Sequence, residues 1–235
     1  MSLNIDKTHF MIFKPKHKKI EDSFDIVING SKINKVQSTK FLGAIIDSEL
    51  SWKPHLDATC RKIAKNIGIM TKARSVFSKD TLLSLYYSFI YPYINYCIHV
   101  WGSTFETHMK KMFSLQKRVI RIIGGVNRKA DCNPLFSSLC ILPLRDIFRY
   151  NVGLFMYKFY HGKLSQIFNI FQRNSEIHDH ETRQSLHLPK PRTEYGKRSF
   201  RYQGVQIWND LYRHIRVNTK IGLFKKNLKS YLLQN

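Results

Sequence analysis

The sequence predicts an α+β fold, in which a small N-terminal antiparallel β-sheet or hairpin is followed by a predominantly α-helical bundle. Over residues 1–50, apolar and polar residues alternate as they do in half-buried strands. From Lys53 onward, apolar residues recur at steps of three and four, which places them on one face of a helix. The chain has 235 residues and 43% hydrophobic content, enough to bury one sizeable core or two small ones.

The N-terminal sheet is predicted from two alternating segments and a tight turn. The residues that share a side are His9, Met11 and Phe13 in the first segment and Phe24, Ile26 and Ile28 in the second. Asn29 and Gly30 follow, and this pair tolerates the positive φ angles of a two-residue hairpin turn. Residues 41–46 are predicted to form a further strand. The basic residues 14–19, interrupted by Pro15, are predicted to form a solvated loop.

The middle of the chain is predicted to be a helical bundle. The residues that share one face of its first helix are Leu56, Cys60, Ile63, Ile67 and Met70. A second helix is expected at residues 80–91, with Ser78 as its N-cap, and a third continues past Pro92 to Trp101. A fourth helix, at residues 106–123, exposes several basic side chains and ends at a glycine pair.

The remaining residues are predicted to be mostly helical, with a polar loop between the helices. The expected helices span residues 144–160, 164–171, 200–211 and 224–233. Residues 132–145 are expected to be irregular because prolines interrupt them. Residues 174–196 are polar, contain Pro189 and Pro191, and are predicted to be a linker or loop.

The composition favours a polyanionic partner. Lys and Arg number 39 against 16 Asp and Glu, which gives a formal net charge of +23. Phosphate backbones fit this imbalance best, since each neutralised phosphate releases condensed counterions and the basic residues are spread along the whole chain. The alternative is a generally basic surface of the ribosomal or chromatin type.

The sequence also bears on location and on membranes. No apolar signal region opens the chain, so the protein is expected to be intracellular, nuclear or cytoplasmic, and not secreted. The 4 cysteines lack metal-finger spacing and are expected to be reduced and mostly buried. Residues 81–105 contain no Asp, Glu, Lys or Arg, but Pro92 and several tyrosine hydroxyls argue against a membrane span. Two buried helices that meet at Pro92 are the preferred interpretation, and no membrane partner is expected.

The order of the sequence segments resembles a known family. The segments are LNIDKTHFMIF, ING, STKFLGAIIDSELSWKPHL, LYYSFIYPYINYCIHVWG, QKRVIRII, PLFSSLCILPLRD, HETR and GKRSFRYQGVQIWNDL. Together they resemble the region after the active-site aspartates in reverse transcriptases of non-LTR (LINE-like or jockey-type) retrotransposons, over nearly the whole chain. The resemblance implies the end of a palm domain with a primer-grip-like hairpin at residues 1–50, a helical thumb-like bundle at 51–125, and a helical C-terminal extension at 126–235.

The resemblance also implies contacts with a primer and its template. Lys7 would stand where a basic residue meets the phosphates of the incoming nucleotide, although it is equally an ordinary lysine at the start of a strand. Phe41, Leu42 and Gly43 resemble the primer grip, in which a glycine-containing turn lets the backbone approach the primer's terminal phosphates. The alternative for this segment is a buried strand with a bulge glycine.

The helices after residue 52 would correspond to the thumb, which follows the backbone of an RNA or RNA/DNA primer-template duplex by shape and charge. The residues expected to contact phosphates are Arg61, Lys62, Lys65, Lys117, Arg118 and Arg121. A solvated helix face also exposes lysines, so each is equally explained as surface. Trp52, Trp101 and Trp208 could stack on bases, but large aromatic residues in apolar segments are more often part of a core.

Catalysis in this family requires carboxylates that hold two divalent ions. They lie just before the LNIDKT segment in such enzymes, so this chain is expected to lack the catalytic aspartates and the earlier carboxylate, and to be inactive alone. No cofactor is expected in this chain, whereas the parent enzyme would use Mg or Mn. The acidic groups present, at residues 21–22 and at Asp47 and Glu49, do not resemble a replacement site, the last two being expected at an exposed strand end. The cluster at residues 178–181 has no standard metal spacing and is expected to be structural.

Two other functions stay open at this stage. The chain could be a basic nucleic-acid-binding protein without polymerase activity, which would share the charge but not the preference for a primed duplex. It could also be a decayed copy with no selected function. A preference for an A-form duplex over single strands would favour the interpretation as a polymerase fragment.

Overall fold

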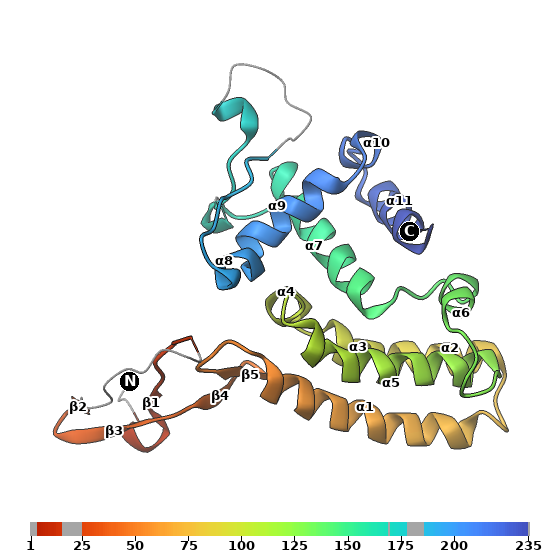
Figure 1. Cartoon of the computed structure of the whole chain (residues 1–235), viewed down its shortest axis with the longest axis horizontal. Helices are drawn as coiled ribbons and strands as arrows, with labels where there is room; N and C mark the ends of the chain where they lie inside the picture. The colour runs from red at the N-terminus through yellow and green to blue at the C-terminus, as the bar shows by residue number, and fades with distance from the viewer. Residues whose placement is uncertain (1–3, 16–24, 169, 178–185, 235) are drawn as a thin grey trace.

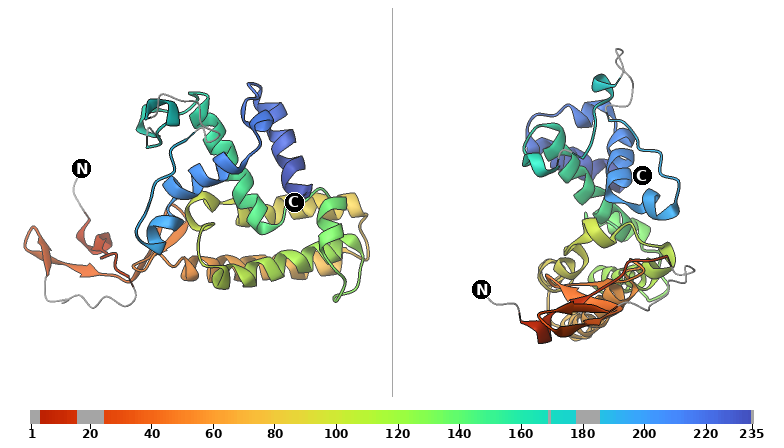
Figure 2. Two further views of the ribbon diagram at one scale, coloured as in Figure 1. Left: turned by 45° about the horizontal axis from the view of Figure 1, so that its top comes forward. Right: turned by 90° about the vertical axis from the view of Figure 1, so that its left-hand side faces the viewer.

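The structure is a computed structural model that describes residues 4–15, 25–168, 170–177 and 186–234. It confirms the predicted fold class, because short strands occupy the N-terminal end and helices make up the rest (Figure 1). The strands form an arm that extends from one end of the long helix α1 (Lys53–Ala73). The C-terminal helices lie on the other side of the molecule from α1 (Figure 2).

The first sheet contains β1 (His9–Phe10), β2 (Ile26–Ile28) and β3 (Ser31–Lys35), in the order β1-β3-β2. The predicted hairpin turn is confirmed, since Asn29 and Gly30 have φ angles of 50° and 76° and Ile28 pairs with Ser31. The expectation of a purely antiparallel sheet is wrong for β1, which runs parallel to β3. The connection between β1 and β2 is long enough for such a crossover.

The second sheet is a hairpin of β4 (Ser38–Phe41) and β5 (Ala44–Asp47). The single strand predicted at residues 41–46 from the residue pattern is therefore wrong, whereas the glycine-containing turn that the resemblance implies at residues 41–43 is present. Leu42 and Gly43 have φ angles of 45° and 85°, so the chain reverses between them. Gly43 suits this conformation because it has no Cβ, whereas the residue type of Leu42 does not favour it.

A buried carboxylate joins this hairpin to α1. Asp47 accepts hydrogen bonds from the backbone nitrogens of Glu49, Ser51 and Trp52, at 3.2, 3.0 and 2.8 Å. Trp52 itself has a φ of 59°, so the carboxylate stabilises a strained connection. The sequence-based expectation that Asp47 lies at an exposed strand end is wrong, because it is 7% exposed.

Helix α1 and the next long helix lie side by side. The five residues predicted to share a face of α1 are all buried: Leu56, Cys60, Ile63, Ile67 and Met70. The second helix is α2 (Lys79–Phe89), whose N-cap Ser78 accepts from the Thr81 nitrogen as predicted. Helix α5 (Glu106–Gly124) matches the fourth predicted helix and ends at Gly125, which has a φ of 67°.

The helix predicted to continue past Pro92 is in fact two helices. They are α3 (Tyr91–Asn95) and α4 (Ile98–Trp101). Cys97 between them has a φ of 51°, which no α-helix accommodates. The Tyr96 carbonyl oxygen at this break accepts a hydrogen bond from the Trp101 indole nitrogen at 2.8 Å, which ties the end of α3 to the buried Trp101. No helix in the described part of the chain is long and apolar enough to cross a membrane.

The C-terminal part contains more helices than predicted. Its helices are α6 (Asn133–Ser138), α7 (Leu144–Tyr160), α8 (Glu194–Arg198), α9 (Phe200–Asp210), α10 (Arg213–Arg216) and α11 (Ile221–Gln234). The segments expected to be irregular or looped contain α6 and α8, each starting at or just after a proline-containing stretch. The helix expected at residues 164–171 is reduced to a 3₁₀ turn at Gln166–Phe168.

One buried cluster of side chains runs from Trp52 to Leu232. Trp52, Trp101 and Trp208 all belong to it, so their interpretation as core residues is confirmed. The described cysteines are free, but the expectation that they are mostly buried fails for Cys140, which is exposed. The domain boundaries predicted near residues 50 and 125 stay predictions. The buried cluster contains residues from both sides of residue 125, so it does not separate the two helical parts.

Two histidines, the buried His55 and the half-buried His99, predict how stability depends on pH. Burial lowers the pKa of His55 and of His99 below the usual 6.5, with smaller contributions from Lys62 and Lys158 respectively. The unfolded chain therefore takes up protons first as the pH falls. We expect the free energy of unfolding to be highest above about pH 7 and to fall as the pH drops through about 6.5. Denaturant titrations between pH 7.5 and 5.5 measure this.

The control is the pair of substitutions His55→Gln and His99→Gln. Glutamine does not titrate and can still accept the hydrogen bond that the Ile45 nitrogen donates to His55 Nδ1 at 3.4 Å. The decline in stability with falling pH should become shallower in the double variant. An identical pH profile would show that these imidazoles are not responsible.

Candidate nucleic-acid interface

The α1 and α5 helices pack in parallel and present basic side chains to solvent. Near their starts, Lys111 Nζ lies 3.1 Å from Asp57 Oδ1. Near their ends, Thr71 and Arg74 of α1 and Arg118 of α5 line one hollow. The two helices therefore form one elongated surface, which we call the basic face (Figure 1).

Arg61, Lys62 and Lys65 are exposed on α1, opposite its buried apolar residues. No described residue forms an ion pair with any of these three cations. Asp57, the acidic residue of α1, is already paired with Lys111. The basic face is thus uncompensated along α1, a distribution typical of surfaces that bind phosphate groups.

The predicted residues of α5 differ from one another in their surroundings. Arg118 is exposed, and Lys117 Nζ lies 4.5 Å from the centre of the Phe113 ring. The Arg121 Nε donates to the Ala130 carbonyl oxygen at 2.8 Å, so this side chain also holds the loop after α5. A hydrogen bond of that kind makes Arg121 less free to contact a ligand than Arg118.

A basic hollow of about 980 Å³ lies at the far end of the basic face. The arginines that line it are Arg74, Arg118, Arg121 and Arg128, and no carboxylate lines it. Arg74 and Arg128 were missed from the sequence because they lie at a helix end and in a loop. Only the parallel packing of α1 and α5 brings them together, so no spacing in the sequence could have found them.

The tip of the β4–β5 hairpin lies at the other end of the basic face, next to α3. Phe41 and Leu42 are 60% and 76% exposed. The Tyr96 hydroxyl donates to the Leu42 carbonyl oxygen, and a Cβ at Gly43 would lie 3.2 Å from the Tyr96 ring. The tip is therefore fixed against α3 while its apolar side chains face solvent.

Helix α3 also connects the hairpin to α1. Lys62 Nζ lies 5.6 Å from the centre of the Tyr93 ring of α3. Asn66 Nδ2 donates to the carbonyl oxygen of Phe89, the last residue of α2, at 2.6 Å. Tyr93 and Phe89 are 37% and 49% exposed. Exposed aromatic rings beside unpaired cations are typical of surfaces that hold nucleic acid by backbone charge and stacking.

Lys7 lies apart from this arrangement. It is exposed at the end of the 3₁₀ turn Ile5–Lys7, which precedes β1. Next to it in the chain, His9 Nε2 lies 2.6 Å from Thr39 Oγ1 and so links β1 to the β4–β5 hairpin. The structure thus brings the hairpin tip and α1 together, and it leaves Lys7 in the neighbouring sheet.

The same hairpin predicts the effect of removing the Tyr96 hydroxyl. In Tyr96→Phe the ring still packs beside Gly43, but the Leu42 carbonyl oxygen loses its donor. We expect faster amide hydrogen exchange in the hairpin, unchanged exchange in α1, and an affinity for a primed duplex that is a few-fold lower. Native-state exchange measured by mass spectrometry checks this. Unchanged exchange in the hairpin would show that the tip is held by other contacts.

The described residues contain no group of three or more His, Cys, Asp or Glu that could hold a metal ion. The cluster at residues 178–181 and the acidic pair at residues 21–22 lie outside the described residues. Both Asp47 oxygens already accept backbone hydrogen bonds. The Asp47 carboxylate is therefore occupied by the backbone of the loop that follows it.

Three known polymerases are similar to part of this chain. The RNA-directed DNA polymerase from the mobile element jockey of Drosophila funebris is 30% identical over 109 residues, which are 45% of this chain and 12% of that polymerase. The probable RNA-directed DNA polymerase from the transposon X-element of Drosophila melanogaster is 27% identical over 104 residues, 43% of this chain and 11% of that protein. The jockey polymerase of Drosophila melanogaster is also 27% identical over 104 residues.

These similarities confirm the resemblance to non-LTR retrotransposon polymerases, over somewhat less than half of the chain. The matched residues are about a tenth of the length of each polymerase. No family model matches the chain. No solved structure matches it either.

Proposed function

We propose, from the similarity to RNA-directed DNA polymerases of jockey and X-element type, that this chain is a fragment of such a polymerase that holds the primer-template duplex. The observation that supports the proposal best is the uncompensated basic face, which begins beside an exposed hairpin tip. The ligand is RNA or an RNA/DNA duplex. The residues proposed to contact it are Phe41, Leu42, Gly43, Arg61, Lys62, Lys65, Lys117, Arg118 and Arg121; Lys7 is proposed as a separate contact, from the neighbouring sheet.

The basic face would hold the duplex through its backbone. Exposed guanidinium and ammonium groups on α1 neutralise phosphates and release condensed counterions, which gives affinity without sequence preference. The 21 residues of α1 extend over about 30 Å at 1.5 Å per residue, close to one turn of a duplex. The surface is therefore long enough to meet several phosphates at once.

The hairpin tip would position the end of the primer. Gly43 lacks a side chain, so the backbone at the tip can come close to a phosphate. Phe41 and Leu42 offer apolar surface to the sugars and bases. Tyr96 fixes the tip relative to α1, which keeps the primer end in register with the duplex on the basic face.

Bond formation itself is assigned to carboxylates outside this arrangement. In polymerases of this kind two divalent ions, Mg or Mn, stabilise the attacking and leaving oxygens. The described carboxylates of this chain do not fit that role, since the Asp47 oxygens, for example, are occupied by backbone hydrogen bonds. We propose that the chain binds and positions a primed template and does not extend it alone.

The test compares ligands and then measures extension. The protein should bind an RNA template with an annealed primer more tightly than either single strand, at equal salt, and should add no nucleotide in Mg or Mn. Equal affinity for all ligands would favour the second candidate, a basic nucleic-acid-binding protein without a polymerase role, which the net charge of +23 supports by itself. Nucleotide addition by the pure chain would contradict the assignment of catalysis elsewhere.

A further inference from the structure

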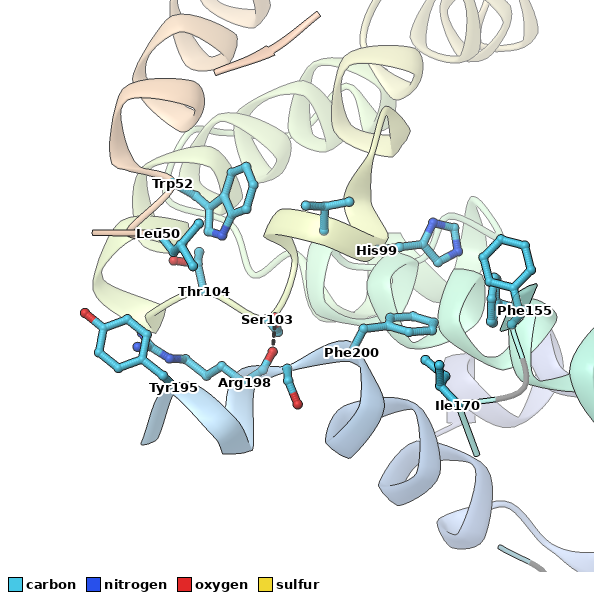
Figure 3. A pocket seen from close by; sticks show the side chains of 13 residues that line it. Leu50, Trp52, His99, Ser103, Thr104, Phe155, Ile170, Tyr195, Arg198 and Phe200 are labelled. Atoms are coloured by element: carbon cyan, nitrogen blue, oxygen red, sulfur yellow. Dashed lines mark hydrogen bonds between the residues drawn. The ribbon is translucent and has the colours of Figure 1, made fainter. Parts of the chain in front are cut away.

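A second hollow lies on a different part of the molecule from the basic hollow. It has a volume of about 580 Å³ and is bordered by the start of α1, by α4, by α7 and by the α8–α9 segment (Figure 3). Leu50 and Trp52 line it on one side, and Phe155, Ile170 and Phe200 line it on the other. We call it the aromatic hollow.

The walls of the aromatic hollow expose unusually large apolar side chains. Val100 is 52% exposed, Phe168 is 40% exposed and Tyr195 is 36% exposed. The rings on one wall meet edge to face, with centroids 4.8 Å apart for Phe155 and Phe200 and 5.4 Å apart for Phe155 and Phe168. Apolar surface gathered around an open hollow is typical of a ligand site.

Arg198 supplies a positive charge at the hollow. Its guanidinium lies 3.6 Å from the centre of the Phe105 ring and 4.7 Å from that of Tyr195, and Figure 3 shows Tyr195 beside it. Its Nη1 is buried and has no hydrogen-bond partner among the described residues. The nearby Glu194 is paired with Lys197 at 2.7 Å, so the charge of Arg198 is not neutralised by it.

His99 supplies a hydrogen-bond acceptor. Its Nε2 lies 3.1 Å from the Asn151 carbonyl oxygen, which can only accept, so this nitrogen carries the proton. Burial lowers the pKa of His99, which keeps the ring neutral near pH 7. Its Nδ1 is then left with a lone pair. The hollow therefore combines aromatic walls, a cation and an acceptor.

We propose that the aromatic hollow binds one unpaired nucleobase of the nucleic acid that lies on the basic face, with the adjoining phosphate near Arg198. A base has flat apolar faces for the aromatic walls and a polar edge for His99, and the phosphate attached to it matches the charge of Arg198. An aliphatic ligand would fill the walls but leave both polar groups unmatched. The hollow is also close to the proposed primer-binding hairpin along the chain, because Leu50 lies three residues after the end of β5.

This inference rests on the proposed function, and its test separates the two. The probes are RNA/DNA duplexes that are either blunt or carry one unpaired template nucleotide, which in one set is the fluorescent base 2-aminopurine. The unpaired nucleotide should raise affinity about tenfold, and protein binding should lower the fluorescence of 2-aminopurine at the unpaired position while changing it little within the duplex. Binding of both duplexes with equal affinity and without quenching would overturn the inference and leave the proposed function standing. Failure of both duplexes to bind would overturn both.

Variants at exposed positions keep the fold intact. Phe168→Ala should remove stacking surface, and Val100→Trp should fill the hollow, so each should abolish most of the tenfold preference while the blunt duplex binds unchanged. Arg198→Ala, at a half-buried position, should also reduce the preference, whereas Arg201→Ala, at an exposed arginine in the first turn of α9, should not.

Tyr87→Ala, an exposed aromatic residue of α2 outside the hollow, is the matched control for Phe168→Ala. The fluorescence of 2-aminopurine bound to the unsubstituted protein reports on the hollow without any variant. If the hollow variants change the oligomeric state instead of the overhang preference, the hollow is a protein-docking surface and the inference is wrong.

Discussion

Reversing the charge of Arg61, Lys65 and Arg118 together should lower the affinity for a primed duplex by about a hundredfold or more at low salt. All three side chains are exposed on the basic face and form no ion pair with a described residue, so the fold should tolerate the change. Arg121 is left intact because its hydrogen bond to the Ala130 carbonyl oxygen holds the loop after α5.

The salt dependence gives a second readout of the same surface. Replacing the same three residues with alanine should flatten the slope of log affinity against log salt by about 0.9 for each phosphate that the protein no longer neutralises. The control for the charge-reversal variant reverses Lys220, Lys225 and Lys226 instead. These lysines are exposed, one just before α11 and two within it, and their reversal changes the net charge by the same amount. Equal reductions in affinity for the two triple variants would show that total charge, not the basic face, determines binding.

Trp101→Ala should cost about 3–5 kcal/mol of unfolding free energy, a large part of what a domain has. Trp101 is fully buried, its ring centre lies 5.9 Å from that of His55, and its indole donates to the Tyr96 carbonyl oxygen. The substitution therefore leaves a cavity and an unpaired acceptor at the point where the hairpin, α1 and α4 meet. Chemical denaturation monitored by circular dichroism measures the decrease in stability.

A role of Trp101 in base stacking would predict a different result from a role in the core. A Trp101 that contacted nucleic acid would, on replacement, lower affinity while leaving stability unchanged. Trp101→Phe should recover much of the stability because it restores most of the buried ring, and Val76→Ala, at a residue that is 77% exposed, should change stability by less than about 0.5 kcal/mol. A stable Trp101→Ala protein would contradict its assignment to the core.

The periodic parts of this fold could be predicted from the sequence. The buried face of α1 and the exposed cations opposite it follow from the 3.6-residue period, and the predicted bounds of α7 are correct for the same reason. The turn at Asn29-Gly30 is predictable because this residue pair has a strong turn preference. In each case the information lies within a few neighbouring residues.

The parts that could not be predicted depend on single backbone conformations or on distant residues. Cys97 adopts positive φ although its residue type disfavours it, and this position creates the α3–α4 break. Leu42 does the same in the β4–β5 turn, which the resemblance to a known family indicated and the residue pattern did not. Asp47 was expected to be solvated because its backbone partners in residues 49–52 come within reach only in the folded loop. The turn at Leu42 is stabilised by the distant Tyr96 hydroxyl, whereas the hydrogen bonds of Asp47 come from residues that follow it closely in the chain.

The candidate site divides in the same way. The cations on α1 are predictable because one helix carries them, whereas the basic hollow and the aromatic hollow each combine residues from separate elements. Arg74 joins Arg118 only through helix packing, and Trp52 and Phe200 line one hollow only because the start of α1 and α9 border it from different sides. Electrostatic character was therefore predictable, and the geometry was not.

The central claim is that the hairpin tip meets the primer end while the basic face holds the duplex. Site-directed cross-linking tests it most directly, with a photoactivatable group attached at Leu42→Cys in a Cys140→Ser background and the primed duplex as ligand. Leu42 is 76% exposed, so labelling should not disturb the fold. We predict cross-links confined to the last few nucleotides at the primer 3′ end. Cross-links spread evenly along the duplex, or none despite tight binding, would contradict the account.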